Sequence, residues 1–154
     1  MKLDKVILSS DDNPDYLEFW PIVSEAWRNI GIEPILFYTG KNKIKNENVF
    51  NFNLEKCDSA FLAQNIRLLA PTLFPNDTCI ISDIDNMPLS EDYFQGNIVN
   101  IADNQFIIYR PDATSEDMIS IMWNAAKGSK WIDIFEVDSV ESISKKLLSW
   151  YPEN

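Results

Sequence analysis

The chain of 154 residues contains no histidine. This absence excludes acid–base catalysis by imidazole, zinc sites with histidine ligands and serine–histidine–aspartate triads. The cysteines number two, Cys57 and Cys79. Cys79 lies within an apolar run and is expected to be a buried thiol, which indicates a reducing compartment and a cytoplasmic location.

Positive charge is also scarce. Lysine and arginine together number 13, against 24 aspartates and glutamates, so the formal net charge is −11. With no stripe rich in lysine and arginine, a nucleic-acid polymer is disfavoured as a partner. A small anion such as a nucleotide diphosphate remains compatible, because a metal ion and local hydrogen-bond donors can offset the negative field.

Long apolar runs are missing. No stretch reaches the length that a membrane span requires, and the run Val6–Leu8 is too short for the apolar core of a signal peptide. The length and the 45% of apolar residues favour one domain with a real core. We therefore expect residues 1–154 to form a single domain without a membrane span, and the oligomeric state stays open.

The first half of the chain predicts alternating strands and helices. Asn13 is expected to cap a helix that begins at Pro14, and Pro21 must kink or split this helix. Either Asp58 or Ser59 caps the next helix. The expected strands cover residues 5–9, 32–39, 49–53 and 79–82, and the helices cover 14–30 and 59–70. Because the strands are apolar runs rather than alternating patterns, we expect an α/β fold whose sheet is covered on both faces.

The second half has less regular signals. The pattern predicts a helical turn over 89–94 and a hairpin with strands at 98–101 and 106–109. A helix over 115–127, capped by Ser115, would turn four side chains inward, namely Ile119, Met122, Trp123 and Ala126. Residues 131–137 are expected to form a strand or irregular structure, and 140–151 a terminal helix.

Two aspartates, Asp83 and Asp85, follow the apolar strand that begins at Cys79. Side chains at positions i and i+2 of a strand point to the same side, so these carboxylates are expected to converge. Adjacent carboxylates repel unless a positive charge lies between them, and a hard divalent cation prefers oxygen ligands. The alternative is a strand-to-loop transition with two capping aspartates.

The segments 63–75 and 79–85 together resemble GT-A glycosyltransferases, in particular the glycogenin and lipopolysaccharide-galactosyltransferase group. The shared pattern is a helix carrying Arg67-Leu68, a turn marked by Pro71 and Pro75, an apolar strand, and then Asp-x-Asp. The resemblance implies a three-layer α/β/α sandwich with a mostly parallel central sheet. It also implies a donor substrate that is a nucleotide-diphosphate sugar, with a UDP-sugar favoured, and an acceptor that the sequence does not identify.

The resemblance also implies roles for single residues. Asp85 would bind Mn²⁺ or Mg²⁺ directly, and Asp83 would contact the ribose, the metal or both. Arg67 would reach the donor sugar or its phosphates. A solvated cation on a helix face is the alternative interpretation of Arg67.

Further donor-binding candidates lie at the end of the first strand and on the helix that carries Arg67. Ser9, Ser10 and Asp11 occupy the place where such folds meet the nucleotide base. Gln64 shares a helix face with Arg67. The alternatives are a plain strand-to-helix turn for the serines and an ordinary surface position for Gln64.

The chain departs from this group in two respects. A histidine near the end of the domain normally completes the metal site, and here water or a later carboxylate, Asp103, Asp112 or Asp117, would have to replace it. Asp103 is therefore predicted, with Arg67, as a catalytic residue. The part of the chain after Asp85 is also short for the group, which is typical of a minimal core of the kind expected in a virus or phage.

Two other functions stay open at this point. One is a degenerate core that binds a nucleotide sugar without turnover. The other is a phosphatase of the haloacid-dehalogenase type, in which the first aspartate of Asp-x-Asp is a nucleophile. That class places Thr or Val two residues after the second aspartate, where this chain has Met87, and it places the motif near the N-terminus.

Overall fold

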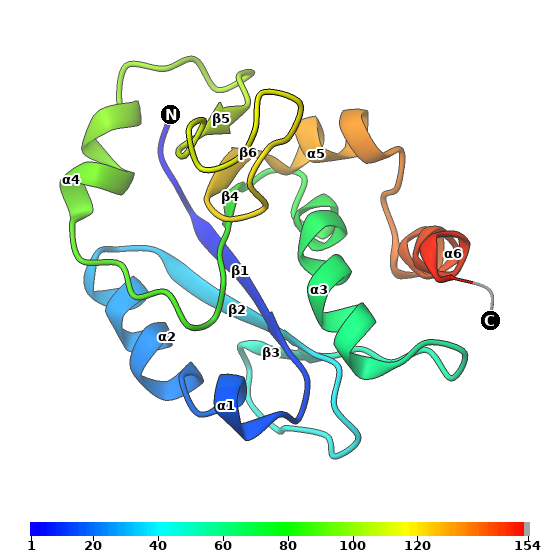
Figure 1. The fold of residues 1–154 in the computed structure, drawn as a ribbon. Helices are drawn as coiled ribbons and strands as arrows, with labels where there is room; N and C mark the ends of the chain where they lie inside the picture. Colours follow the sequence, from blue (N-terminus) through cyan, green and yellow to red (C-terminus); the bar gives the residue numbers. More distant parts are fainter. Residues whose placement is uncertain (153–154) are drawn as a thin grey trace.

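The computed structural model describes residues 1–152, which fold around a six-stranded mixed sheet (Figure 1). The strands are β1 (Lys5–Ser10), β2 (Glu33–Tyr38), β3 (Val49–Asn51), β4 (Thr78–Ile81), β5 (Ile107–Ile108) and β6 (Asn124–Lys127). The α-helices are α1 (Pro14–Leu17), α2 (Trp20–Asn29), α3 (Ser59–Leu69), α4 (Glu91–Phe94), α5 (Gly128–Phe135) and α6 (Val140–Trp150). Short 3-10 helices cover Ala70–Leu73 (η1) and Gly96–Ile98 (η2).

The strand order is β3-β2-β1-β4-β6-β5. Strands β3, β2, β1 and β4 run parallel, and β6 pairs antiparallel with both β4 and β5. The mostly parallel sheet that the resemblance implies is thus confirmed. From β1 the chain proceeds to β2 on one side and later returns to β4 on the other, so the direction of winding reverses between β1 and β4.

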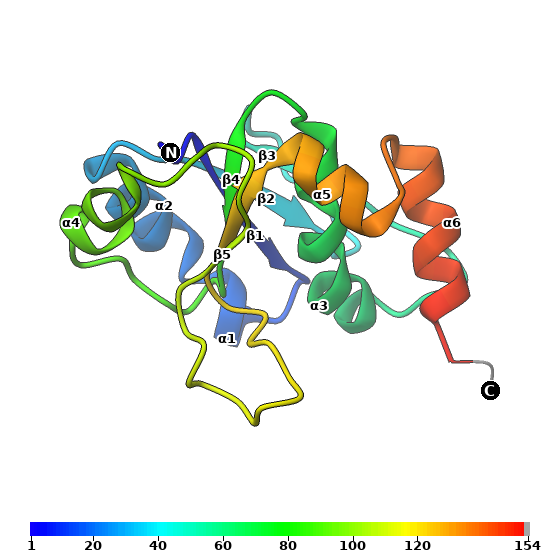
Figure 2. The ribbon, with the colours of Figure 1, turned by 90° about the horizontal axis from the view of Figure 1, so that it is seen from above.

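The sheet lies between two helical layers. Helices α1, α2 and α4 lie on one side, and α3, α5 and α6 lie on the other (Figure 2). Along β1, Ile7 packs into the core beneath α3 and α6, whereas Val6 and Leu8 pack into the core beneath α2 and α4. All three are fully buried. Because both faces are covered, β1, β2 and β4 each carry a run of consecutive buried apolar residues, as the apolar runs predicted.

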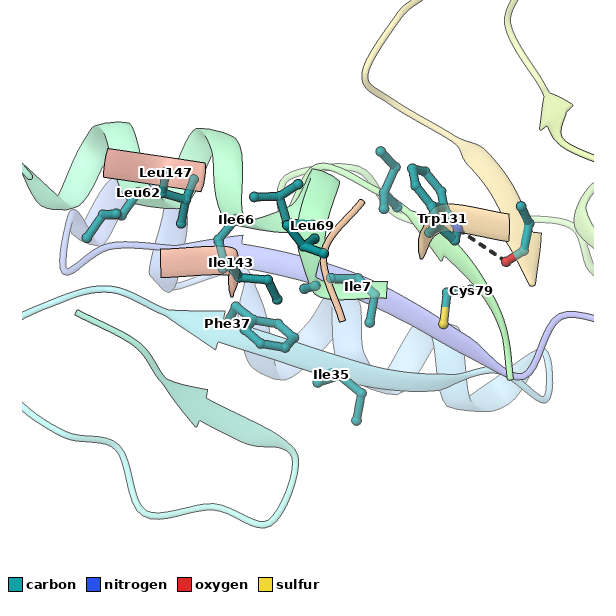
Figure 3. Packing of buried hydrophobic residues seen from close by; sticks show 14 of the residues in the cluster. Ile7, Ile35, Phe37, Leu62, Ile66, Leu69, Cys79, Trp131, Ile143 and Leu147 are labelled. Atoms are coloured by element: carbon teal, nitrogen blue, oxygen red, sulfur yellow. Dashed lines mark hydrogen bonds between the residues drawn. The ribbon is translucent and has the colours of Figure 1, made fainter. Parts of the chain in front are cut away.

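The α3 side of the core is built from helix stripes laid on the strands. Three residues of α3 at helical spacing are fully buried, and two residues of α6 complete the layer (Figure 3); they are Leu62, Ile66, Leu69, Ile143 and Leu147. Farther along, Trp131 of α5 fills this core, and its indole Nε1 donates a hydrogen bond to the carbonyl of Ala126 at 3.2 Å. The interior side of α3 therefore packs against the core, and its opposite side is available to line a site.

Cys79 of β4 belongs to the same core. Burial raises the pKa of its thiol to about 12. The prediction of a buried thiol is confirmed, and the thiol stays protonated and unreactive at neutral pH.

The helix starts predicted in the first half of the chain are confirmed. The Asn13 side chain accepts a hydrogen bond from the backbone N–H of Asp15 at 3.0 Å, and Pro14 follows in the first turn of α1. Pro21 lies in the first turn of α2, so the proline splits the predicted helix into α1 and α2. Asp58 caps α3, accepting from the N–H of Phe61 at 2.7 Å.

The helix predicted over 115–127 is wrong. Its last four residues form strand β6, which lies between β4 and β5 and carries the fully buried Ala125 and Ala126. Residues 115–123 are irregular, Ser115 caps no helix, and Ile119 is 62% exposed rather than inward. Alanine favours helix locally, but pairing with a buried neighbouring strand decides the outcome here.

Two neighbouring predictions also fail. The predicted hairpin is wrong, because residues 96–98 form η2 and the short β5 pairs with β6 instead. Residues 131–137, expected as strand or irregular structure, belong mostly to helix α5.

At Gly128, where α5 begins, a Cβ atom would lie 2.0 Å from the carbonyl oxygen of Phe74. Only glycine permits this close approach of α5 to the end of η1.

None of the helices within residues 1–152 has both the length and the apolar character that crossing a bilayer demands.

Candidate functional site

A pocket of about 350 Å³ opens at the carboxyl ends of β1 and β4. This is the point where the winding of the sheet reverses, and in open α/β sheets it is the usual place for a ligand. The pocket is lined by Ser9, Ser10, Asp11, Asn13, Tyr16, Ala60, Ala63, Gln64, Arg67, Asp83, Ile84 and Asp85. The structure thus brings together all of the predicted site residues except Asp103, from the end of β1, from α3 and from the turn after β4.

The end of β1 forms one wall of the pocket. The Ser9 hydroxyl donates to the carbonyl of Ala63, which ties β1 to α3. The Ser10 hydroxyl donates to the carbonyl of Asp11 at 2.9 Å. The Asp11 carboxylate accepts from the backbone N–H of Asn13 at 3.0 Å, which fixes the turn into α1. This wall is therefore polar and held in place by its own hydrogen bonds.

The outward side of α3 forms the opposite wall. Ala60, Ala63, Gln64 and Arg67 recur at helical spacing and line the pocket, on the side of the helix away from its buried stripe. The two alanines leave room between the helix and the sheet edge. The longer Gln64 and Arg67 side chains supply the polar groups of this wall.

Arg67 is paired with Asp83 across the pocket floor. Its guanidinium forms an ion pair with the Asp83 carboxylate and donates to the carbonyl of Ser82 at 3.3 Å. The Arg67 side chain is only 12% exposed and that of Asp83 is 32% exposed. Within residues 1–152 the buried Nε of Arg67 has no hydrogen-bond partner, so one donor of the guanidinium remains unused.

Asp85 lies at the open side of the site and is exposed. The Asn86 amide donates to the carboxylates of both Asp83 and Asp85, at 3.3 and 3.4 Å. Strand β4 ends at Ile81, so the two aspartates lie in the turn that follows it rather than on the strand. The turn and the Asn86 bridge, not the alternation of a strand, bring these carboxylates to one pocket.

The charge of the pocket is negative. Among its lining residues, three carboxylates, from Asp11, Asp83 and Asp85, face the guanidinium of Arg67. Across residues 1–152 no group of three or more cysteine, aspartate and glutamate side chains gathers as a metal cage. Asp83 and Asp85 fit a hard divalent cation by their oxygen ligands, but a full coordination shell would need further oxygens from a ligand or water.

Asp103 is placed elsewhere. Its carboxylate lies 3.7 Å from the terminal ammonium group of Met1, which precedes the amino end of β1. The pocket opens at the carboxyl end of the same strand. The structure therefore does not bring Asp103 to the predicted site, since its carboxylate lies near the opposite end of β1 from the pocket.

Sequence reasoning did not name Asn13, Tyr16 or Ile84 as site residues, although all of them line the pocket. Tyr16 shares the helical spacing of the apolar residues in the predicted helix 14–30, a pattern typical of side chains that face the core. Because that helix is split, Tyr16 on α1 is instead 49% exposed and lies against the pocket. The signal that could have revealed it is Pro21, since a break before this proline frees the first helical turn from the stripe that follows.

Because Asp83 is ion-paired with Arg67 and Asp85 is not, substitution of the two aspartates should affect the stability of the ligand-free protein differently. Like-charge repulsion alone predicts that Asp83→Asn and Asp85→Asn both leave stability unchanged or raised. Because Asp83 is the partner of Arg67, Asp83→Asn should instead lower the unfolding free energy by about 1–3 kcal/mol, the cost of leaving a charged donor unpaired. Asp85→Asn should stay within about 0.5 kcal/mol of the parent, as expected for an exposed position.

Urea unfolding of the parent and both variants, without metal or nucleotide, measures this difference. Equal stability of all three proteins would mean that the Arg67–Asp83 pair contributes nothing to the fold. A loss in Asp85→Asn as large as that in Asp83→Asn would identify both aspartates as structural caps.

Comparison with solved structures shows which known proteins share this fold. No protein-family model matches the chain, and no curated protein matches it in sequence. The apo-form glycosyltransferase GlyE of Streptococcus pneumoniae TIGR4 is similar over 97% of this chain, with a TM-score of 0.51 and 11% identity. Galactosyltransferase LgtC, solved with donor and acceptor sugar analogues, is similar over 96% of this chain, with a TM-score of 0.49 and 12% identity.

The chain spans 44% of the length of GlyE and 64% of that of LgtC. The strand order and the two helical layers agree with the sandwich that the sequence resemblance implies. The chain therefore has the α/β fold of a GT-A glycosyltransferase.

Proposed function

We propose that this chain binds a nucleotide-diphosphate sugar in the pocket between β1 and β4 and transfers the sugar to an acceptor. The observation that carries the proposal is the convergence of Asp83, Asp85 and Arg67 with the polar end of β1 in one pocket. The pocket lies at the winding reversal of the sheet, where nucleotides bind in open α/β folds. The fold shared with GlyE supports the same conclusion.

The two walls of the pocket suit two parts of such a donor. Tyr16 offers an exposed aromatic face on which a base can stack, because stacking needs only a π-face. Ser10 and Asp11 offer hydrogen-bonding groups beside it. Arg67 and Gln64 lie on the α3 wall, where a guanidinium can bind phosphate or sugar oxygens through two parallel hydrogen bonds.

A divalent cation, Mn²⁺ or Mg²⁺, belongs to the proposal for an electrostatic reason. A diphosphate would be repelled by a pocket in which three carboxylates face one guanidinium. Asp83 and Asp85 would hold the ion, which would stabilise the negative charge of the departing nucleoside diphosphate. Arg67 would stabilise the same charge from the α3 side, and a UDP-sugar is the donor we favour.

A thermal-shift panel of nucleotides and nucleotide sugars, with and without Mn²⁺, tests the binding step. A UDP-sugar with Mn²⁺ should raise the melting temperature, because a ligand at a hundredfold excess over its Kd stabilises by about 2.7 kcal/mol. UDP-sugar without metal should give a much smaller shift. No shift with any nucleotide diphosphate would contradict the proposal.

A time course of UDP release from UDP-sugars with Mn²⁺ then separates turnover from binding. Release that exceeds one equivalent per protein supports a transferase or hydrolase activity. Binding without release would identify a nucleotide-sugar-binding module. Release of inorganic phosphate from a phosphomonoester would instead favour a phosphatase.

A further inference from the structure

Trp123 has an unusual backbone conformation just before β6. Its φ angle is 61°, in the left-handed region that bulky side chains rarely adopt. The other non-glycine residue of positive φ among residues 1–152 is Glu136, at the C-terminal end of α5, where that conformation is ordinary. Such strain at Trp123 persists only where the surrounding contacts impose it.

Those contacts join Trp123 to the end of β4. Its backbone N–H donates to the carbonyl of Ile81 at 2.8 Å, and its own carbonyl accepts from the N–H of Tyr109 at 3.1 Å. Its indole Nε1 donates to the hydroxyl of Ser82 at 3.0 Å. One residue thus holds both the last residue of β4 and the residue that follows it.

The indole ring is fixed in turn by an aromatic cluster. It packs edge-on against Phe94, with ring centroids 5.2 Å apart, and against Tyr93 at 5.9 Å. The hydroxyl of Tyr109 donates to the Phe94 carbonyl at 2.6 Å, which closes the cluster. The direction of the indole N–H is therefore set by packing on several sides.

Ser82 connects Trp123 to the pocket. It is fully buried, and its carbonyl accepts from the guanidinium of Arg67 at 3.3 Å. Its hydroxyl, held by Trp123, donates to the carbonyl of Asp83 at 3.2 Å. Ser82 thus lies between the strained Trp123 on one side and the Arg67–Asp83 ion pair on the other.

We propose that Trp123 is a positioning residue that orients Asp83 and Arg67 through Ser82. The expected effect of Trp123 on ligand binding rests on the proposed function, whereas its expected effect on the Arg67–Asp83 ion pair does not. Core filling would require only the aromatic ring. The indole hydrogen bond to Ser82 and the imposed backbone conformation are features that core filling does not explain.

Trp123→Phe tests this role, because it keeps a ring and removes the indole N–H. Trp27→Phe is the matched control: Trp27 also packs edge-on against Phe94, at 4.9 Å, and within residues 1–152 its Nε1 has no hydrogen-bond partner. Trp123→Phe should weaken binding of UDP in the presence of Mn²⁺ about tenfold, the effect of one lost hydrogen bond. Trp27→Phe should leave this Kd within about twofold of the parent, since no hydrogen bond is lost.

A second variant checks that the effect passes through Ser82. Ser82→Ala should weaken binding to a similar extent, and the double variant with Trp123→Phe should be no weaker than either single variant. Additive losses would overturn the route through Ser82. Equal losses in Trp123→Phe and Trp27→Phe would show a general effect of the aromatic cluster and would also overturn the proposal.

A readout on the free protein separates this inference from the proposed function. The side-chain Nε–H of Arg67 can be followed by ¹H–¹⁵N NMR and assigned by its loss in Arg67→Lys. Its exchange with water should be at least about fivefold faster in Trp123→Phe than in the parent or Trp27→Phe, because this buried N–H has no hydrogen-bond partner within residues 1–152 and is protected by the packing of the guanidinium against Ser82 and Asp83. Unchanged exchange in Trp123→Phe overturns the inference, whether or not the parent binds UDP.

Discussion

Asp85→Asn should remove most of the manganese affinity that UDP confers on this protein. In the parent we expect weak binding of Mn²⁺ alone, because Asp83 is shared with Arg67 and two carboxylates are too few for an octahedral ion. UDP would supply the missing oxygens, so the metal and the nucleotide should each tighten the binding of the other. Loss of a direct ligand should cost at least about 100-fold, the upper end of what loss of an outer-shell partner costs.

Calorimetric titrations of Mn²⁺ into the protein, with and without UDP, measure this effect. Asp133→Asn is the matched control, because Asp133 is an exposed carboxylate on α5 and lines no part of the pocket. The control should bind as the parent does. Equal metal affinity in Asp85→Asn and the parent would remove the metal site from the proposal.

Arg67→Ala should change two affinities in opposite directions. Binding of a UDP-sugar at fixed Mn²⁺ should weaken by about 1.5–3 kcal/mol, the value of one hydrogen bond to a charged group. Binding of Mn²⁺ alone should tighten, because the variant no longer holds a guanidinium against the Asp83 carboxylate. A merely structural role for Arg67 would weaken both.

Arg67→Lys and Arg28→Ala complete the comparison. Lysine keeps the charge but lacks the planar fork, so Arg67→Lys should recover only part of the UDP-sugar affinity. Arg28 lies on α2, where its guanidinium donates to the Ser24 hydroxyl at 3.4 Å, outside the pocket. Arg28→Ala should bind as the parent does. If Arg67→Ala also matched the parent, Arg67 would have no part in binding the donor.

The sequence by itself determined the parallel half of the fold. The apolar runs of β1, β2 and β4 predicted strands buried on both faces, and Asp58 predicted the start of α3, since caps and periodicity act within a few residues. Local reasoning also indicated that Asp83 and Asp85 converge, whereas the other polar pocket residues were predicted from the resemblance to GT-A glycosyltransferases. Their roles in binding remain predictions.

The tertiary structure alone decided the rest. Residues 124–127 have helical propensity but pair with β4, because burial between two strands outweighs a weak local preference. That pairing in turn brings Trp123 to Ser82, across 41 residues of the chain, which no local pattern could indicate. Asp103 likewise lies beside Met1, near the opposite end of β1 from the pocket, a position that no local pattern around Asp103 could indicate.

The ion pair between Arg67 and Asp83 was also decided by the tertiary structure. The sequence predicted that each residue would face the pocket, but their direct contact depends on the distance between α3 and the turn after β4. That distance is set by the packing of the α3 stripe on the sheet. Local patterns determine which faces a segment presents, whereas long-range packing decides which of those faces meet.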